Sequence, residues 1–124
     1  MFEFPKNHKL CSEKVIKRLF SNSNSFVENP LRLVWRFEKN TDEVAIKSLI
    51  VVSKNRLNLA SERNKVKRRI REALRKNKLT LDEYLKESKK QINLAIIYQQ
   101  EEILDSTIIE EKIKVLLGRL KEDL

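Results

Sequence analysis

The chain has 124 residues, 40% of them hydrophobic, and its 27 Lys and Arg against 18 Asp and Glu give a formal net charge of +9 at pH 7. This length favours one domain with a single modest core, while one Cys and one His exclude an internal disulfide and a zinc site made by this chain alone. No apolar run approaches the roughly 18 to 20 residues that span a bilayer. Residues 1–10 lack the apolar core of a signal peptide, so we expect a cytoplasmic protein with no membrane partner.

The N-terminal part of the chain predicts a short helix and then a connection. Ser12 is expected to cap a helix in SEKVIKRLF (12–20). The apolar side chains on one face of this helix are Val15, Ile16, Leu19 and Phe20. The polar segment SNSNSFVENP (21–30) is expected to be a connection of low order.

Three apolar segments have the pattern of β-strands. LRLVWRF (31–37) alternates, and the side chains on its apolar side are Leu31, Leu33, Trp35 and Phe37. VAIKSLIVVSK (44–54) is rich in β-branched residues, and KNTD (39–42) before it is typical of a turn. QINLAIIYQ (91–99) is apolar enough to be buried on both faces, which predicts a central strand.

Two further segments have helical periodicity. Residues 61–78 read SERNKVKRRIREALRKNK, and the apolar stripe along this helix comprises Leu59, Val66, Ile70, Ala73 and Leu74. Residues 106–121 repeat Ile and Leu at a spacing of three to four, which predicts an amphipathic closing helix. We find no internal repeat or domain boundary, so residues 1–124 are expected to form one domain.

The charge is concentrated in the segment 61–78, which has nine basic and two acidic residues and a local net charge of +7. The segment 100–124 has seven acidic and four basic residues, a net charge of −3. A charged helix face is usually only a solvated face, but here the acids that would balance it are missing. Because the cations repel one another unless a partner neutralises them, nucleic-acid binding is the favoured interpretation.

The run VSKNRLNLASERNKVKRRIREALR (52–75) resembles the signature of the bacterial ribonuclease P protein subunit. In that family a strand ending in valine-serine-lysine precedes a helix with an arginine-asparagine-arginine-like motif. The segment FPKNHKLCSEKVIKRLF (4–20), the strand LAIIY (94–98) and the amphipathic C-terminal segment also fall where the family would place them. The chain departs from the family pattern at Lys65, the third motif position, and at Ile16, where many members carry an aromatic residue.

The resemblance implies a small single-domain α+β fold, an α/β sandwich with the element order α-β-β-β-α-β-α (ribosomal-protein-S5-domain-2-like). In this fold a left-handed crossover through the basic helix joins two strands of the central sheet. Sequence physics alone would not predict that crossover, because right-handed crossovers prevail in about 98% of cases.

The resemblance also implies the protein subunit of a ribonucleoprotein endonuclease that removes the 5′ leader of precursor tRNA. The RNA subunit of that enzyme performs the hydrolysis with Mg²⁺, so we expect no catalytic residue, no metal ligand and no organic cofactor on this chain. The implied partners are the ribonuclease P catalytic RNA and the precursor tRNA 5′ leader, with no obligate protein partner.

The residues that match the RNA-binding motif helix of the family are Arg63, Asn64, Lys65, Lys67, Arg68, Arg69, Arg71 and Arg75. The positions that match the leader-binding cleft are Ile16, Phe20, Trp35 and Lys54. Core packing is the alternative for Phe20 and for Trp35, and Val34 competes with Trp35 for the strand position, since a slip of one residue changes the face.

Two other functions remain open from the residues alone. A ribosomal-protein-like structural RNA-binding protein would use the same basic helix for packing between RNA segments. A DNA-binding regulator is less favoured because no paired helix-turn-helix pattern is present. Catalysis by the chain itself is disfavoured, since neither His8 nor Cys11 has a partner in the sequence that would activate it.

Overall fold

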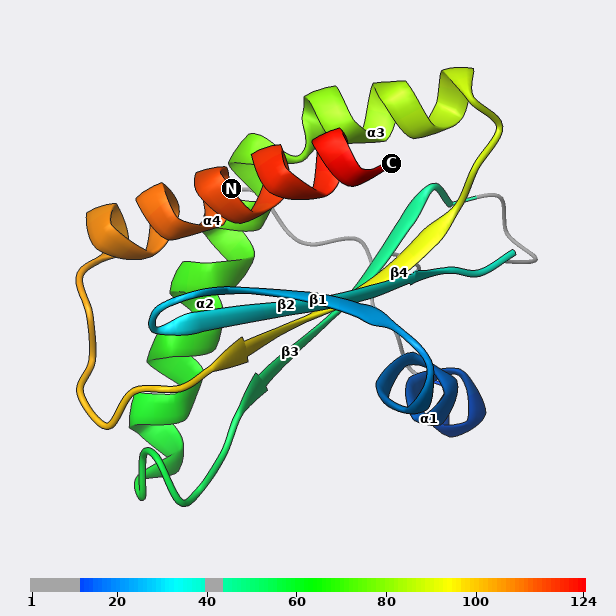
Figure 1. Ribbon diagram of the computed structural model, residues 1–124. Helices are drawn as coiled ribbons and strands as arrows, with labels where there is room; N and C mark the ends of the chain where they lie inside the picture. Colours follow the sequence, from blue (N-terminus) through cyan, green and yellow to red (C-terminus); the bar gives the residue numbers. More distant parts are fainter. Residues whose placement is uncertain (1–11, 40–43) are drawn as a thin grey trace.

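The computed structural model describes residues 12–39 and 44–124, which form a four-stranded sheet with helices on both faces (Figure 1). In chain order the elements are α1 (Glu13–Ser21), β1 (Asn24–Glu28), β2 (Leu31–Phe37), β3 (Ile46–Val52), α2 (Ala60–Asn77), α3 (Leu79–Glu87), β4 (Ile92–Tyr98) and α4 (Ser106–Asp123). The expected α+β class and the order α-β-β-β-α-β-α are confirmed, with α3 as an additional helix.

The strands lie in the order β1-β2-β4-β3, so β4 is an inner strand, as its continuous apolar sequence predicted. The pairs β1–β2 and β2–β4 are antiparallel, whereas β3 and β4 are parallel. Parallel neighbours need a connection that returns to the starting end of the sheet, and α2 and α3 form it. The expected crossover through the basic helix is therefore present, and its left-handed sense stays a prediction of the family resemblance.

Two elements differ from the expectation. Helix α3 begins directly after Lys78, whose backbone N–H caps α2 by donating to the Leu74 carbonyl at 3.0 Å, and it is docked by the buried side chains of Leu81 and Leu85. Strand β1 lies inside the segment 21–30 that was expected to be a connection. This strand is an edge strand with mostly exposed side chains, so its sequence lacks the alternation that marks a half-buried strand.

One face of the sheet, here called the helix face, packs against α2, α3 and α4. The predicted alternation of β2 is confirmed there, because Leu31, Leu33 and Trp35 are at most 2% exposed. Phe37 follows the same alternation but is 46% exposed, since β2 ends at this residue. The helix face therefore holds most of the hydrophobic core.

The opposite face, here called the α1 face, is covered by α1 (Figure 1). Ser12 caps this helix as predicted, with its Oγ accepting from the Val15 N–H at 3.4 Å. The buried residues between α1 and the sheet are Leu19, Val34 and Ala95. Within the two described ranges, no helix is long and apolar enough to cross a membrane.

Candidate nucleic-acid interface

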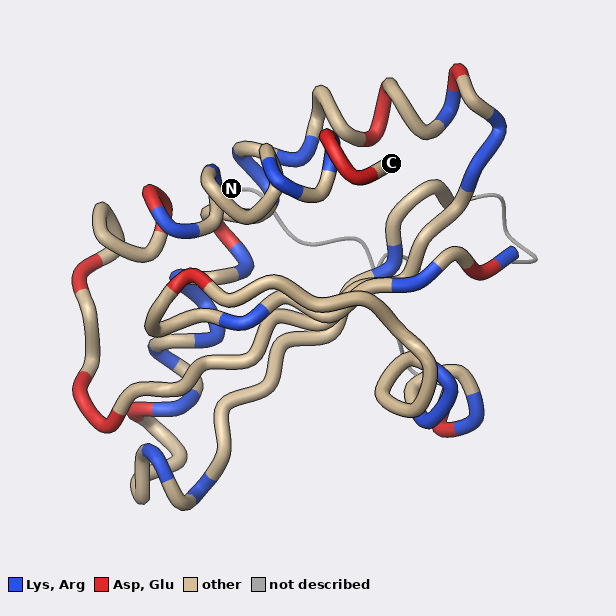
Figure 2. The backbone as a smooth tube through the Cα atoms, viewed as in Figure 1, with Lys and Arg blue, Asp and Glu red and all other residues tan. Residues whose placement is uncertain are grey.

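Helix α2 is anchored to the core by one apolar stripe and presents basic side chains around the rest of its circumference. The stripe predicted from the sequence is confirmed for the buried residues Val66, Ile70, Ala73 and Leu74, whereas Leu59 is 61% exposed because it precedes the first turn. Figure 2 shows Lys and Arg recurring along α2, while acidic residues mark α4 and the loop before it. The core thus holds a rigid, positively charged helix at the surface.

Three of the eight predicted RNA-contact residues donate hydrogen bonds inside the protein. Arg63 Nη1 donates to the carbonyls of Leu57 at 2.9 Å and Asn58 at 2.8 Å, which fixes the loop between β3 and α2. Arg69 Nη1 donates to the Leu104 carbonyl at 2.6 Å, at the start of α4. These arginines have a structural function whether or not their remaining donors reach RNA.

Arg75 is the third of these residues, and it pairs with a carboxylate on its own helix. Its Nη2 lies 2.6 Å from Glu72 Oε1, one turn away. This hydrogen bond lowers the pKa of Glu72 below its ordinary value and raises that of Arg75. One of the two acidic residues of the basic segment therefore neutralises Arg75, and the excess positive charge lies on the other side chains.

The remaining five predicted contacts are directed outward. Asn64, Lys65 and Arg68 are exposed, and Lys67 and Arg71 are half-buried. Their side chains form no hydrogen bond or ion pair with another residue of the described ranges. This group, here called the outward basic set (Asn64, Lys65, Lys67, Arg68 and Arg71), is free to contact phosphates, and its role in RNA binding stays a prediction.

Lys54 is exposed in the turn that follows β3, as the strand-end motif predicted. The turn is closed by the backbone N–H groups of Arg56 and Leu57, which both donate to the Ser53 carbonyl at 3.2 Å. Since Arg63 binds the end of the same loop, the position of Lys54 is coupled to the start of α2. Lys54 therefore lies in the loop that leads into α2, the helix that carries the outward basic set.

On α1, the two predicted leader contacts have different environments. Phe20 is 44% exposed while its neighbour Leu19 is fully buried, so the core-packing alternative for Phe20 is wrong. Ile16 is partly buried against the cluster of Leu19, Val34 and Ala95, so much of its side chain serves to hold α1 on the sheet. An exposed aromatic ring provides a π surface on which a base can stack, and Phe20 offers one on α1.

The expectation that Trp35 contacts the leader is wrong, and its core-packing alternative is right. Trp35 is 2% exposed and belongs to the core on the helix face, where its ring meets Phe37 edge-on with the centroids 5.1 Å apart. The β2 residue toward α1 is Val34, because neighbouring side chains of a strand point to opposite faces.

An arginine network on the α1 face was not identified as functional from the sequence. Arg18 Nη2 lies 2.5 Å from Glu38 Oε1, and Arg36 Nε lies 3.3 Å from Glu38 Oε2. Arg36 also donates to the Arg18 carbonyl at 3.3 Å, so the network ties α1 to the end of β2. Arg32, four residues before Arg36 on the same side of β2, is exposed. The alternation of LRLVWRF contained this signal, since it placed Arg32 and Arg36 opposite the core side chains.

A metal centre has no support in the part of the chain that the structure describes, where no three His, Cys, Asp or Glu residues form a group that could hold an ion. His8 and Cys11 lie outside the described residues. The expectation that Mg²⁺ is held mainly by an RNA subunit stays a prediction.

Comparison with known proteins identifies the family. A family model described as Ribonuclease P matches residues 4–121. The chain belongs to this family. Two proteins from strains of Porphyromonas gingivalis, each named ribonuclease P protein component, are 31% and 33% identical to it over 96% of this chain and 87% of their own lengths.

Solved ribonuclease P proteins have the same fold. The Staphylococcus aureus protein superposes with a TM-score of 0.68 at 19% identity and covers 92% of this chain and 95% of its own. The Thermotoga maritima protein gives a TM-score of 0.69 at 22% identity, covering 90% and 96%. Membership of the family makes this chain a component of an endoribonuclease ribonucleoprotein, with RNA binding and tRNA processing as the implied roles.

Proposed function

We propose that this chain binds the ribonuclease P catalytic RNA through α2, holds the single-stranded 5′ leader of precursor tRNA on the α1 face, and so promotes endonucleolytic removal of the leader. The observation that carries the proposal is the combination of the outward basic set on α2, the exposed Lys54 in the loop that leads into this helix, and the exposed Phe20 on α1. Basic side chains on a rigid helix suit the phosphates of folded RNA.

For the catalytic RNA, exposed Lys65 and Arg68 are the side chains best placed to neutralise phosphates. Arg68 offers a planar fork that can bind two phosphate oxygens, whereas Lys65 offers a single ammonium group. Arg63 and Arg69 retain further N–H donors beyond the bonds they make inside the protein. Each of these contacts releases counterions, so affinity for RNA should fall steeply with salt.

For the leader, Phe20 is the proposed stacking platform and Lys54 the proposed phosphate contact. A base on an aromatic side chain contributes about 1 to 3 kcal/mol and tolerates any sequence. Arg32 adds an exposed cation on the side of β2 that faces α1, and its Nη2 donates a long 3.4 Å bond to Ser25 Oγ. Leaders of different sequence could therefore bind to the same residues.

Hydrolysis and its Mg²⁺ are assigned in this proposal to the RNA subunit, and the protein contributes positioning and charge neutralisation. Neutralising phosphates with side chains does part of what dissolved cations do, so the protein should matter most when Mg²⁺ is scarce. A cytoplasmic location and the absence of an organic cofactor and of an obligate protein partner remain predictions.

The experiment is cleavage of precursor tRNA by a bacterial ribonuclease P RNA at low Mg²⁺, with and without this protein, on substrates with a long leader and with none. We expect the protein to restore cleavage and to tighten binding only of the substrate that has a leader. Lys114→Gln is a matched control, because it removes a lysine from α4 that pairs only with Glu110 on its own helix.

A ribosomal-protein-like structural RNA binder is the competing function. It predicts RNA affinity that is indifferent to the leader, together with no restoration of cleavage. RNA binding without either effect would overturn the proposed subunit function and leave that alternative in its place.

A further inference from the structure

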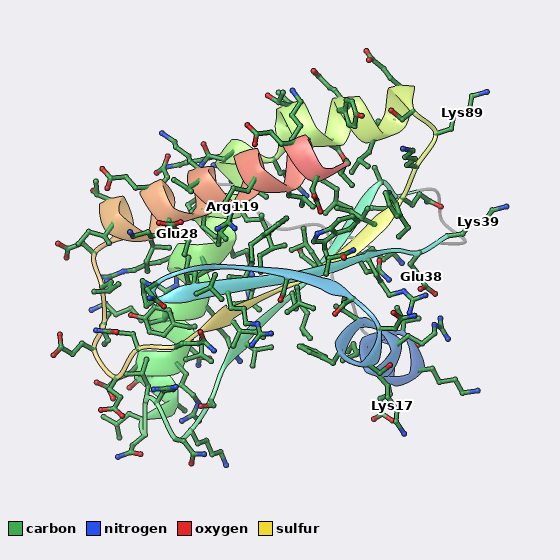
Figure 3. The ribbon with its side chains drawn as sticks, in the orientation of Figure 1. Lys17, Glu28, Glu38, Lys39, Lys89 and Arg119 are labelled. Atoms are coloured by element: carbon green, nitrogen blue, oxygen red, sulfur yellow. The ribbon has the colours of Figure 1, made fainter. Side chains whose placement is uncertain are left out.

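A hollow at the rim of the sheet has no residue of α2, and not Phe20, among the described residues that line it. It has a volume of about 540 Å³ and is lined by the end of β2 and the start of β4, through residues Phe37, Glu38, Lys39, Lys89, Lys90 and Gln91. Because β3 runs parallel to β4, this rim is at the opposite end of the sheet from Lys54. Figure 3 shows Lys39 and Lys89 extending outward on this side of the molecule.

The hollow combines an aromatic surface with positive charge. The Phe37 ring is 46% exposed, and the Lys90 ammonium lies 5.5 Å from its centroid. The single carboxylate of the lining, Glu38, is paired with Arg18 and Arg36, so the three lysines are not neutralised by it. An aromatic platform among cations is the arrangement by which proteins hold single-stranded nucleic acid, with the base stacked and the phosphates paired.

Lys89 occupies a backbone conformation that normally selects glycine. Its φ is +56°, and it follows α3 at the position where Lys89 N–H donates to the Lys86 carbonyl at 3.2 Å and Lys90 N–H to the Leu85 carbonyl at 2.9 Å. These two bonds define a Schellman motif, in which glycine is the usual residue at the left-handed position. A lysine there costs conformational free energy, which indicates that its side chain serves a function beyond ending the helix.

We propose that this rim site, Phe37 with Lys39, Lys89 and Lys90, binds a nucleotide of the distal part of the precursor tRNA leader, beyond the segment held by Phe20. The inference rests on the proposed leader function. A seven-residue strand such as β2 spans about 20 Å, so a leader that enters at Lys54 and crosses the α1 face reaches this rim. Phe37 is on the helix-face side of β2, next to Trp35, so the leader turns around the end of β2 to reach its exposed ring. Arg18 connects the two places, because it belongs to α1 and binds Glu38 of the rim.

The test is binding of precursor tRNA to the holoenzyme assembled with each variant, using substrates with no leader, a leader of about four nucleotides and a leader of about twelve, lengths that single-stranded binding folds cover. Phe37→Leu should weaken binding of the long-leader substrate by roughly five- to a hundredfold, the range for one stacked base, and leave the other two unchanged. Phe37→Tyr keeps the ring and should keep the affinity.

Lys89→Gly separates binding from folding. Glycine suits the left-handed position, so the variant should be at least as resistant to urea as the parent while its long-leader binding loses about one unit of salt slope. Lys89→Arg keeps the charge and should preserve the slope, and Lys114→Gln, which removes a lysine elsewhere, should change neither quantity.

The outcomes distinguish this inference from the proposed function. Phe20→Ala should weaken both leader substrates, and if it does so while Phe37→Leu and Lys89→Gly leave the long leader unaffected, the rim site is overturned and the leader function stands. Equal weakening of the substrate that lacks a leader would assign the rim to the catalytic RNA and would also overturn the proposal. Unchanged RNA binding in every arm, Phe20→Ala included, would overturn both the rim site and the proposed leader function.

Discussion

The two faces of the sheet use the same strands for different purposes. On the helix face, β2 places Leu31, Leu33 and Trp35 in a core covered by three helices. On the α1 face, the alternate residues of β2 are Arg32, Val34 and Arg36. One short helix, α1, covers this face, and Leu19 is the only buried residue among the described residues of that helix. Strand alternation thus separates the side chains of the main core from those on the α1 face, where Arg32 is exposed.

The largest difference between the faces should appear in stability. Trp35→Ala would remove a fully packed ring from the helix face, and such changes cost about 3 to 5 kcal/mol of unfolding free energy. Phe20→Ala removes a ring of similar kind that is 44% exposed, and substitutions at the surface usually stay within about 0.5 kcal/mol. Urea unfolding of the two variants measures the contrast.

Comparable losses for the two variants would show that Phe20 is a packing residue, and the division of labour between the faces would be wrong. Because Trp35→Ala lowers the stability most, Trp35→Phe serves as a milder second variant with the same expected direction.

A smaller effect is expected in leader binding, and here a substitution on the α1 face should matter more than one on the helix-face side. Phe20→Ala should lower the affinity for a precursor tRNA with a leader by about 1 to 3 kcal/mol, the contribution of one stacked base, and leave a substrate without a leader unchanged. Leu79→Ala is the matched control, since Leu79 is an exposed apolar residue of α3, on the helix-face side. An equal loss for the control would indicate a general rather than a leader-specific effect.

The same contrast exists within α2, between arginines bonded to the protein and those that are not. Arg63→Ala removes two hydrogen bonds to loop carbonyls and should cost about 1 to 2 kcal/mol of stability, since bonds to charged groups are among the stronger ones. Arg68→Ala should leave stability unchanged and reduce the salt slope of RNA binding by about one unit. Urea unfolding and RNA titration at several salt concentrations measure the two effects.

An unchanged slope for Arg68→Ala would remove this residue from the RNA contacts. Stability that is unaffected by Arg63→Ala would mean that the loop holding Lys54 does not depend on α2.

Local patterns were sufficient to predict the elements that bury a face. Burial can be predicted directly from the alternation of LRLVWRF and from the stripe of Val66, Ile70, Ala73 and Leu74. Residues repeated every two positions in a strand, or every three to four in a helix, have side chains on the same face. The basic surface of α2 was equally predictable from the sequence, because the net charge of one segment can be counted. Trp35 was ambiguous for the same reason: alternation assigns a face but cannot say which face carries the core.

Features that depend on distant partners could not be predicted. Arg69 binds Leu104, 35 residues away, so nothing near Arg69 distinguishes it from the outward-directed Arg68. Strand β1 exists because β2 pairs with it, and its exposed side chains leave no alternating pattern. The rim site joins residues near 38 and 90, which come together only when β2 and β4 pair.

The smallest expected effect concerns Tyr98, which belongs to the helix face alone. Its hydroxyl donates to the Glu102 carbonyl and accepts from the Leu104 N–H at 3.2 Å, so it holds the segment between β4 and α4. Tyr98→Phe should cost about 1 kcal/mol of unfolding free energy near neutral pH and leave RNA affinity unchanged. Urea unfolding and RNA titration of the variant check both statements.

The pH dependence of that loss tests its cause. Burial raises the pKa of Tyr98 above its ordinary value of 10.0, because the charged phenolate is poorly solvated there. A group whose pKa is raised by folding contributes stability that is complete below the unfolded pKa and is lost as pH rises through the folded one. The stability difference between the parent and Tyr98→Phe should therefore shrink above about pH 10, since Phe has no proton to lose. A difference that stays constant up to the alkaline unfolding of both proteins would assign the effect to packing rather than to the buried hydroxyl.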